Sequence, residues 1–243
     1  MKIIMLNTWG HSGPYQKRWE VLFRELERYT PDVLCLQEVF QPELVQKLEK
    51  KFLFSHVLKS YEAGLVLMTQ FPISSHQILN YKAISPNEQQ NRQALLVGLK
   101  IHTKEIVIAN THLSWKAEDE SVRHSQVQEL LQAIANQGHL ALLAGDFNDV
   151  AGSKPIEEIR KAGYVDLYNL LHAKKPKITW DNQNPFIQTH NVKFSDRQID
   201  FLFLHNKLIK ANTIKKCEII FNRPDQNGIY PSDHYGVLAD LSF

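Results

Sequence analysis

A histidine with an aspartate beside it stands just ahead of an apolar run near the end of this chain. The segment reads Ser232-Asp233-His234, and residues 237–241 after it are mostly apolar, as a buried strand would be. An imidazole held at such a place can be tuned to exchange protons near neutral pH, with the acid to assist it. Taken alone, the segment could equally be a turn that starts a strand.

Polar residues stand at one end of an apolar run at five other places in the chain. Asn7 follows the run 3–6, Glu38 follows 32–36, His112 follows 105–109, Asp146 and Asn148 follow 139–144, and Asp200 opens the run 201–204. An unpaired buried charge is costly, so acidic and amide residues rarely interrupt buried strands without partners. Six such clusters predict an active site built on strand ends, where a rigid scaffold holds the reacting groups.

These residue types suit a hard divalent cation and phosphate chemistry. Glu38 with further oxygen donors fits Mg²⁺, which keeps several waters and uses one or two protein carboxylates. With histidines and amides around it, such an ion can neutralise a phosphate and organise in-line attack by water. A zinc site is disfavoured because no two His or Cys residues show ligand spacing. A Ser-His-Asp hydrolase is also disfavoured, because the sequence contains no Gly-x-Ser-x-Gly elbow.

Hydrophobic periodicity predicts the elements that must position these clusters. Apolar residues at helical spacing predict helices over residues 15–29, 43–51, 118–136 and 155–162. Runs rich in Val, Ile and Leu predict strands over residues 3–6, 33–36, 52–58, 65–68, 73–79, 94–101, 106–109, 140–144, 199–204, 214–221 and 237–241. We expect the strands between residues 52 and 113 to form a meander.

No low-complexity linker, internal repeat or break in composition divides the chain. The polar clusters span Asn7 to His234, so any division would split the site. We therefore expect a single domain over residues 1–243. Because strands alternate with helices in each half, the pattern predicts an α/β fold. Two mixed β-sheets would pack face to face with helices on the outside, as a four-layer sandwich.

The composition, 43% hydrophobic and 22% charged, is that of an ordinary soluble globular protein. A net charge of +2 is too small to indicate nucleic acid or an anionic membrane by itself. The apolar strand around Cys35 favours reduced core thiols over a disulfide with Cys217. The apolar run 3–6 is too short for a signal peptide or a membrane span. We expect a cytoplasmic protein, although export without a cleavable signal remains open.

The order of the polar motifs resembles that of the endonuclease/exonuclease/phosphatase superfamily, which has the deoxyribonuclease I-like fold. The resemblance covers essentially the whole chain, residues 2–242. Each motif alone is weak evidence, and six in family order carry the assignment. The motifs are Leu6-Asn7-Thr8-Trp9, Leu36-Gln37-Glu38-Val39, Asn110-Thr111-His112-Leu113, Gly145-Asp146-Phe147-Asn148, Arg197-Gln198-Ile199-Asp200 and Pro231-Ser232-Asp233-His234.

The resemblance implies metal-ligating and water-activating roles for the motif residues. Glu38 would be the principal Mg²⁺ ligand, for which Mn²⁺ can substitute, with Asn7 close by and Asp233 reaching this metal or a second one. His234 would activate the attacking water, and Asp200 would hold its ring in the working tautomer.

The remaining catalytic positions would handle the water and the phosphoryl oxygens. Asp146 and Asn148 would hold the nucleophilic water and a phosphoryl oxygen, and His112 would stabilise charge or help the leaving group. Within this family, either Asp146 or the Asp200–His234 pair takes the proton, and the sequence leaves both open.

Each motif residue also has an ordinary structural explanation. Asn7 could cap a turn, Glu38 could be an acid in the first turn of a helix, and Asp146 with Asn148 could form a common turn. His112 alone is more often a structural histidine. Only the joint pattern outweighs these explanations.

Three further residues are predicted to bind substrate. Trp180 lies in an irregular segment before Asp200 and would either pack in the core or stack on a base. Arg92 and Arg123 could bind phosphate, although a surface ion pair is the plainer explanation for Arg123. Lys174, Lys175 and Lys177 form a basic cluster that favours a solvated loop over a phosphate contact.

The motifs resemble two branches of the family at once, the tyrosyl-DNA phosphodiesterases and the neutral sphingomyelinases. The expected function is Mg²⁺-dependent hydrolysis of a phosphodiester, with nucleic acid or a 5′ end adduct favoured as substrate. The alternatives are a sphingomyelinase-like phospholipase C and a catalytically inactive binding module. Retention of every expected polar group argues against the inactive module, and the sequence leaves the oligomeric state open.

Overall fold

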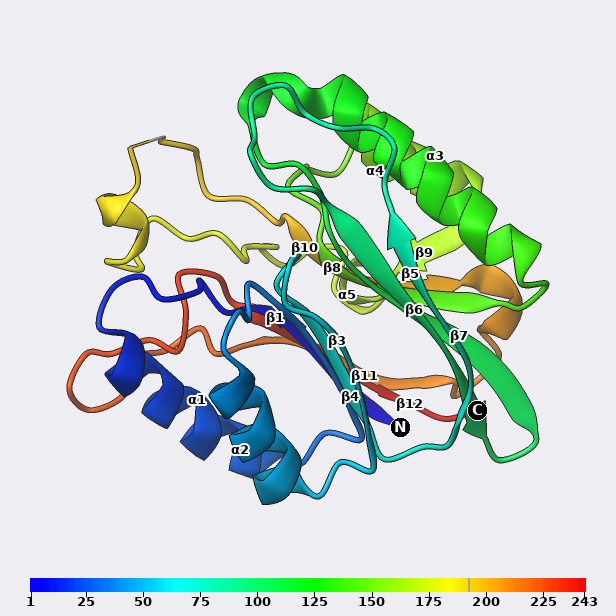
Figure 1. The fold of residues 1–243 in the computed structure, drawn as a ribbon, viewed down its shortest axis with the longest axis horizontal. Helices are drawn as coiled ribbons and strands as arrows, with labels where there is room; N and C mark the ends of the chain where they lie inside the picture. The colour runs from blue at the N-terminus through cyan, green and yellow to red at the C-terminus, as the bar shows by residue number, and fades with distance from the viewer. Residues whose placement is uncertain (192) are drawn as a thin grey trace.

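The computed structural model describes residues 1–191 and 193–243. Two six-stranded mixed β-sheets pack face to face, and helices cover the outer face of each sheet (Figure 1). Both chain termini lie at the same end of the sandwich (Figure 1). The predicted α/β fold with four layers is therefore confirmed.

The first sheet has strands near both ends of the chain at its centre. Its order is β11(Ile214–Ile220), β12(Gly236–Leu241), β1(Lys2–Asn7), β2(Val33–Gln37), β4(Leu65–Thr69) and β3(His56–Ser60). Strands β1 and β2 are parallel, whereas the other neighbours are antiparallel. Helices α1(Tyr15–Tyr29) and α2(Pro42–Phe52) cover its outer face (Figure 1).

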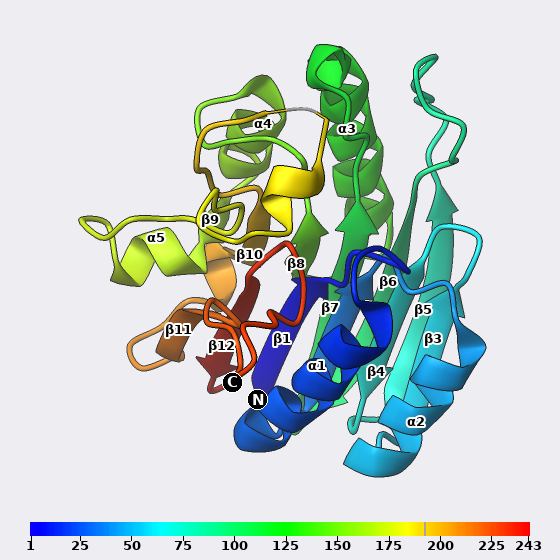
Figure 2. The same ribbon diagram turned by 90° about the vertical axis from the view of Figure 1, so that its left-hand side faces the viewer.

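The second sheet repeats this plan with one parallel pair. Its order is β5(Ile73–Asn80), β6(Gln93–Ile101), β7(Lys104–His112), β8(Ala141–Asp146), β10(Asp200–His205) and β9(Tyr164–Asp166). Strands β7 and β8 are parallel. Helices α3(Glu120–Asn136) and α4(Lys154–Lys161) cover the outer face (Figures 1 and 2). The remaining elements are α5(Leu167–Leu171) and the short 3-10 helices η1(Ala117–Asp119), η2(Ile187–Thr189) and η3(Asn206–Leu208).

Three apolar layers hold the sandwich together. The central layer lies between the sheets and contains both free thiols, Cys35 and Cys217, each fully buried. The outer layers pack helix residues such as Leu22 and Leu130 onto the sheets. Burial of apolar surface contributes about 25 cal/mol per Å², so these continuous layers are the main source of stability.

Several predicted boundaries were wrong. The strand expected over residues 52–58 begins only at His56, because α2 continues to Phe52 before ending in a left-handed Leu53. Strand β9 and helix α5 were not predicted, since three and five residues carry too little periodicity. Strands β1, β7 and β8 end on Asn7, His112 and Asp146 themselves rather than before them.

None of the helices in the described ranges has the length and apolar character that crossing a lipid bilayer requires.

A buried arginine on α1 ties together the loops beside the polar strand ends. The Arg18 side chain is 0% exposed, although no carboxylate pairs with it among the described residues. Its guanidinium donates instead to the carbonyls of Thr8, Gly10, Ser12 and Pro231 over 2.8–3.0 Å. Burial lowers the pKa of Arg18 to about 10, so the group stays charged at neutral pH.

Arg18→Met should therefore destabilise the fold far more than removal of an exposed arginine. The variant leaves several buried carbonyls without a donor, which predicts a loss of about 3–5 kcal/mol in the free energy of unfolding. Urea denaturation followed by circular dichroism measures this loss. Arg28→Met is the matched control on the same helix, since the Arg28 side chain is 70% exposed. Equal losses in the two variants would contradict the anchoring role of Arg18.

Candidate active site

The two sheets bring their polar strand ends to one place. Strand β1 contacts β8 and β10 across the sandwich, and Figure 2 shows these three strands side by side. In β7 and β8 the register pairs His112 with Asp146, and in β8 and β10 it pairs Asp146 with Asp200. Hydrogen bonding within each sheet thus fixes the positions of these side chains before any contact between them forms.

Residues beside the strand ends adopt an unusual backbone conformation. Trp9, Glu38 and Asn148 have φ angles of 58°, 58° and 52°, in the left-handed region that non-glycine residues rarely occupy. Such conformations persist only where the surrounding structure imposes them, and they concentrate at functional sites. Here they turn the chain sharply after β1, β2 and β8.

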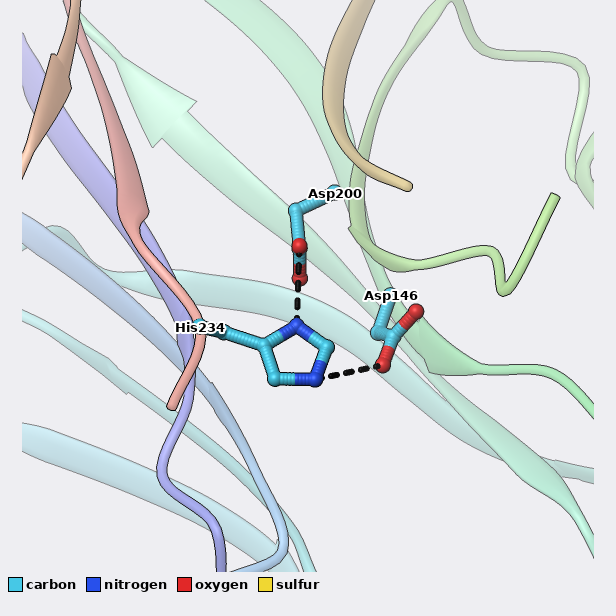
Figure 3. A group of neighbouring side chains, drawn as sticks. All are labelled: Asp146, Asp200 and His234. Carbon is cyan, nitrogen blue, oxygen red and sulfur yellow. Dashed lines mark hydrogen bonds and ion pairs between the residues drawn. The ribbon is translucent and has the colours of Figure 1, made fainter. Parts of the chain in front are cut away.

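His234 lies between two aspartates of the second sheet, as Figure 3 shows. Its Nδ1 lies 2.9 Å from Asp200 Oδ2, and its Nε2 lies 3.9 Å from Asp146 Oδ2. All three side chains are at least 95% buried. The bond to Asp200 fixes the orientation of the ring, and the second nitrogen consequently faces Asp146.

An asparagine amide links this group to the glutamate on the opposite sheet. Asn7 Nδ2 donates to Glu38 Oε1 over 3.0 Å and to Asp146 Oδ2 over 2.9 Å. Asn7 Oδ1 accepts from the backbone N–H of Trp9 over 3.0 Å. Asn7 therefore bridges two carboxylates through its amide group, and its role as a metal ligand stays a prediction.

Asn148 and His112 complete the surroundings of Asp146. The backbone N–H of Asn148 donates to Asp146 Oδ1 over 2.9 Å, and Asn148 Nδ2 donates to the carbonyl of Leu113 over 3.0 Å. His112 Nε2 lies 3.5 Å from Asp146 Oδ2. Asp146 is thus the hub that Asn7, His112, Asn148 and His234 all approach.

Burial shifts the pKa values of Asp146 and Glu38 upward and that of His112 downward. Burial, reinforced by Asp200, raises the pKa of Asp146 to about 7, and burial with Asp233 raises the pKa of Glu38. Burial also lowers the pKa of His112 well below its usual value, with Arg92 adding to the effect. The histidines near Asp146 are therefore not equivalent.

For His234 the carboxylates outweigh the burial. Desolvation favours the neutral ring, but Asp200, Asp233 and Asp146 together raise the pKa of His234 well above its ordinary value. A protonated His234 beside a neutral His112 gives one proton donor and one potential acceptor at the same site.

A second histidine–aspartate pair, which the sequence analysis missed, closes one side of the site. His190 Nε2 lies 2.8 Å from Asp233 Oδ2, and the His190 side chain is 29% exposed. Its ring lies 4.9 Å from that of Trp180, measured between centroids. His190 belongs to an irregular segment with no motif around it, so no local signal in the sequence could have identified it.

These residues line one pocket of about 530 Å³. Its lining includes seven of the predicted catalytic and metal-binding residues and two of the predicted substrate-binding residues. They are Asn7, Glu38, His112, Asp146, Asn148, Asp233, His234, Arg92 and Trp180. Asp200 lies behind His234 and is 0% exposed.

The three predicted substrate-binding residues occupy different positions. Arg92 lines the pocket; its Nε lies 2.7 Å from Glu88, while its buried Nη1 has no partner among the described residues. Trp180 also lines the pocket but is only 8% exposed, and its ring meets that of His234 edge to face. Core packing thus fits Trp180 better than stacking on a base.

Arg123 is buried and lies outside the pocket lining. Its Nε lies 2.8 Å from Asp149, and its Nη1 donates to the carbonyls of Ser114 and Lys116. The ion pair expected for Arg123 is present, but both partners are buried rather than at the surface. Of the basic cluster, Lys177 donates to Asn169, away from the pocket lining.

The donor set fits a divalent cation. Four carboxylates, Glu38, Asp146, Asp200 and Asp233, gather around the pocket, and the buried Asp200 Oδ1 has no hydrogen-bond donor among the described residues. Ligand atoms of Asp146, Asp200 and His234 lie within 4.8 Å of one another. Asp200 occupies Nδ1 of His234, and Mg²⁺ prefers oxygen ligands, so carboxylates such as Glu38 are the better hard-ion ligands.

Stability without a metal ion should decrease as the pH rises. A group whose pKa is higher in the folded state than in the unfolded state stabilises the fold fully when the pH is below the unfolded-state pKa. This stabilisation is lost as the pH rises through the folded-state pKa of the group. Asp146 and His234 both have raised pKa values, so both act in the same direction. The unfolding temperature in EDTA should therefore fall between about pH 5 and pH 8, and Asp146→Asn should flatten this fall. A wild-type unfolding temperature that rises over the same pH interval would contradict the raised pKa values of these two residues.

Several known proteins resemble this chain in sequence. Nocturnin of Homo sapiens is 27% identical over 93% of this chain, and tyrosyl-DNA phosphodiesterase 2 of Homo sapiens is 24% identical over 89%. Protein angel of Drosophila melanogaster is 30% identical over 63% of the chain. The chain spans 59%, 60% and 49% of these proteins, respectively.

Solved structures agree with the architecture. TDP2 of D. rerio, complexed with a single-strand DNA product, superimposes with a TM-score of 0.81 at 22% identity, covering 100% of this chain and 99% of that one. The human Nocturnin catalytic domain with bound sulfate gives a TM-score of 0.78 at 19% identity, covering 100% and 94%. At these identities the likeness establishes the fold.

The sequence profile of the endonuclease/exonuclease/phosphatase family matches residues 6–234, which include every motif residue from Asn7 to His234. The chain therefore belongs to the endonuclease/exonuclease/phosphatase family.

Proposed function

We propose that this protein is a Mg²⁺-dependent phosphodiester hydrolase in which a metal ion assists in-line attack of water on phosphorus. The observation that carries the proposal is the arrangement of His234 between Asp200 and Asp146 at the base of a pocket lined by Glu38. Its substrate is a nucleic-acid phosphodiester or an adduct at a 5′ end.

The Asp200–His234 pair orients a proton-transfer group toward the pocket. With Nδ1 held by Asp200 at 2.9 Å, only Nε2 of His234 is available to the reacting groups. Asp146 lies beside that nitrogen, at 3.9 Å, so the two groups act on the same water. The pKa of Asp146, raised to about 7, suits proton exchange near neutral pH, whereas the pKa of His234, raised well above its ordinary value, favours the protonated ring.

A cationic group would neutralise the phosphate, and neutral polar groups would donate hydrogen bonds to it. Arg92 brings a buried guanidinium whose Nη1 is free of hydrogen bonds among the described residues. A phosphoryl oxygen is the natural acceptor for such a group, because guanidinium–phosphate bonds are charge-assisted. Asn148 and His112 would hold further phosphoryl oxygens from the β7–β8 side.

Glu38, with Asp233 and Asn7 near it, would hold the Mg²⁺, and Mn²⁺ would substitute. When bound, the ion supplies Lewis-acid stabilisation of the phosphoryl oxygens and lowers the pKa of a coordinated water. Asn7 Nδ2 donates to both Glu38 and Asp146. This bridging amide holds the proposed metal-binding and proton-transfer groups next to each other.

The relatives support nucleic acid over lipid as the substrate class. Their names include a probable RNA exonuclease and a tyrosyl-DNA phosphodiesterase, and one related structure holds a single-strand DNA product. These properties belong to those proteins, and the common family and site geometry are the reason to extend them here.

The metal requirement and the substrate class can be tested together. Purified protein should hydrolyse an end-labelled oligonucleotide with Mg²⁺ or Mn²⁺ and lose this activity in EDTA. Glu38→Gln should lower activity by about 10²-fold or more, because it removes the charged metal ligand. Gel electrophoresis of the products and calorimetric Mg²⁺ titration provide the two readouts. Full activity in EDTA would reject the metal role, and cleavage of sphingomyelin vesicles with intact oligonucleotides would favour the phospholipase C alternative.

Asp200 and His234 should behave as one unit in a double-mutant cycle. Asp200→Asn and His234→Ala should each reduce kcat by about 10²- to 10⁴-fold, and the double variant should be little worse than either single one. Single-turnover rates at saturating Mg²⁺ measure the three losses. Additive losses would mean that the two residues do not act together, and a near-normal His234→Ala enzyme would assign water activation to Asp146.

A further inference from the structure

The rim of the active-site pocket presents an aromatic side chain with a free face. Trp115 lines the pocket and is 40% exposed, whereas Trp9 and Trp180 in the same pocket are each 8% exposed. Trp115 follows His112 by three residues, on the segment that leaves β7. Among the pocket tryptophans, Trp115 therefore has the accessible surface that a planar ligand needs.

A buried carboxylate joins Trp115 to the arginine inside the pocket. The backbone N–H of Trp115 donates to Glu88 Oε1 over 2.5 Å, and Arg92 Nε donates to Glu88 Oε2 over 2.7 Å. The side chains of Arg92 and Glu88 are only 5% and 3% exposed. Glu88 thus sets the position of Trp115 relative to the guanidinium that would bind a phosphoryl oxygen.

Arg123 fixes the residues on both sides of Trp115. Its Nη1 donates to the carbonyl of Ser114 over 3.1 Å and to that of Lys116 over 2.6 Å, while Asp149 holds its Nε. The exposed indole therefore stands on a rigid backbone. A backbone segment held in this way loses little further entropy when a ligand binds beside it.

Lys116 covers one face of the indole. Its Nζ lies 4.0 Å from the centroid of the Trp115 ring, and no second aromatic ring packs against Trp115 in the described part of the chain. A flat apolar surface with a cation beside it matches a nucleobase with its phosphate, since bases stack on indoles and phosphates attract lysine.

We propose that Trp115 is a stacking platform for an unpaired nucleobase next to the scissile phosphate. The proposal rests on the proposed phosphodiesterase function and specifies its substrate as single-stranded nucleic acid or a frayed end. In the interior of a duplex, neighbouring base pairs cover both faces of each base, so the platform would have no surface to contact there. Lys116 and Arg92 flank the platform and would bind the backbone phosphates on either side of that base.

The test compares substrates that share a backbone but differ in their bases. Wild type, Trp115→Ala and Trp115→Phe are assayed with Mg²⁺ on a single-stranded oligodeoxynucleotide and on an abasic oligomer of equal length. Trp115→Ala should lower kcat/KM on the oligodeoxynucleotide by about 5- to 100-fold, leaving the abasic oligomer within about 2-fold. Trp115→Phe should recover most of the loss, because it keeps an aromatic face.

Two controls isolate the effect of the indole. Leu170→Ala removes an apolar side chain that is 48% exposed on α5, outside the pocket, and should change neither rate. Fluorescence anisotropy in EDTA should show the same rise in Kd for Trp115→Ala without any turnover. Blunt duplex of the same sequence should be a poorer substrate for wild type than the single strand.

The outcomes separate the platform from the activity on which it rests. If wild type cleaves neither oligomer, the proposed nucleic-acid phosphodiesterase function fails. If wild type cleaves the oligodeoxynucleotide and Trp115→Ala is equally fast, only the platform is overturned. Equal losses on the abasic oligomer would mean that Trp115 merely shapes its loop. A loss seen on lipid vesicles alone would make the indole a membrane contact and would also overturn the proposal.

Discussion

The cost of burying four carboxyl groups around one pocket of about 530 Å³ determines how the neighbouring residues are arranged. These groups belong to Glu38, Asp146, Asp200 and Asp233. Each carboxylate has a donor or a cationic partner, and His234 faces two of them. A charged group removed from water either finds compensation or changes its protonation state, and both responses occur here. The raised pKa of Asp146 and that of His234 are two consequences of the same crowding.

Such a site needs a rigid scaffold, because repulsion between the carboxylates would otherwise move them apart. The sheets supply it, because hydrogen-bond register fixes His112, Asp146 and Asp200 on adjacent strands. The loops are held separately by Arg18, which uses a fully buried charge to bind carbonyls of residues 8–12 and Pro231. The apolar layers between the sheets and under the helices stabilise the fold and offset the free-energy cost of the buried charged groups.

The predicted motif residues that line the pocket were easier to identify from the sequence than the residues around them. Asn7, Glu38 and Asp146 interrupt apolar runs, and that local contrast is visible in the residues alone. By contrast, His190 lies in an irregular segment, and its partner Asp233 is 43 residues away in the chain. A contact between residues so far apart in the chain produces no periodic pattern in the sequence. The same reason explains Arg123, whose sequence neighbours suggest an exposed helix, whereas the fold buries it against Asp149.

In the proposed function, reaction and recognition depend on different parts of the fold. The groups proposed for proton transfer and metal binding lie at strand ends, where a displacement would disrupt the hydrogen bonding of a sheet. Trp115 and His190 stand on connecting segments, which can vary in length and sequence without disturbing either sheet. Glu88 couples the two parts, because one carboxylate contacts both Trp115 and Arg92. Under the proposed function, specificity would be set by loops whose geometry is fixed relative to the pocket by buried ion pairs.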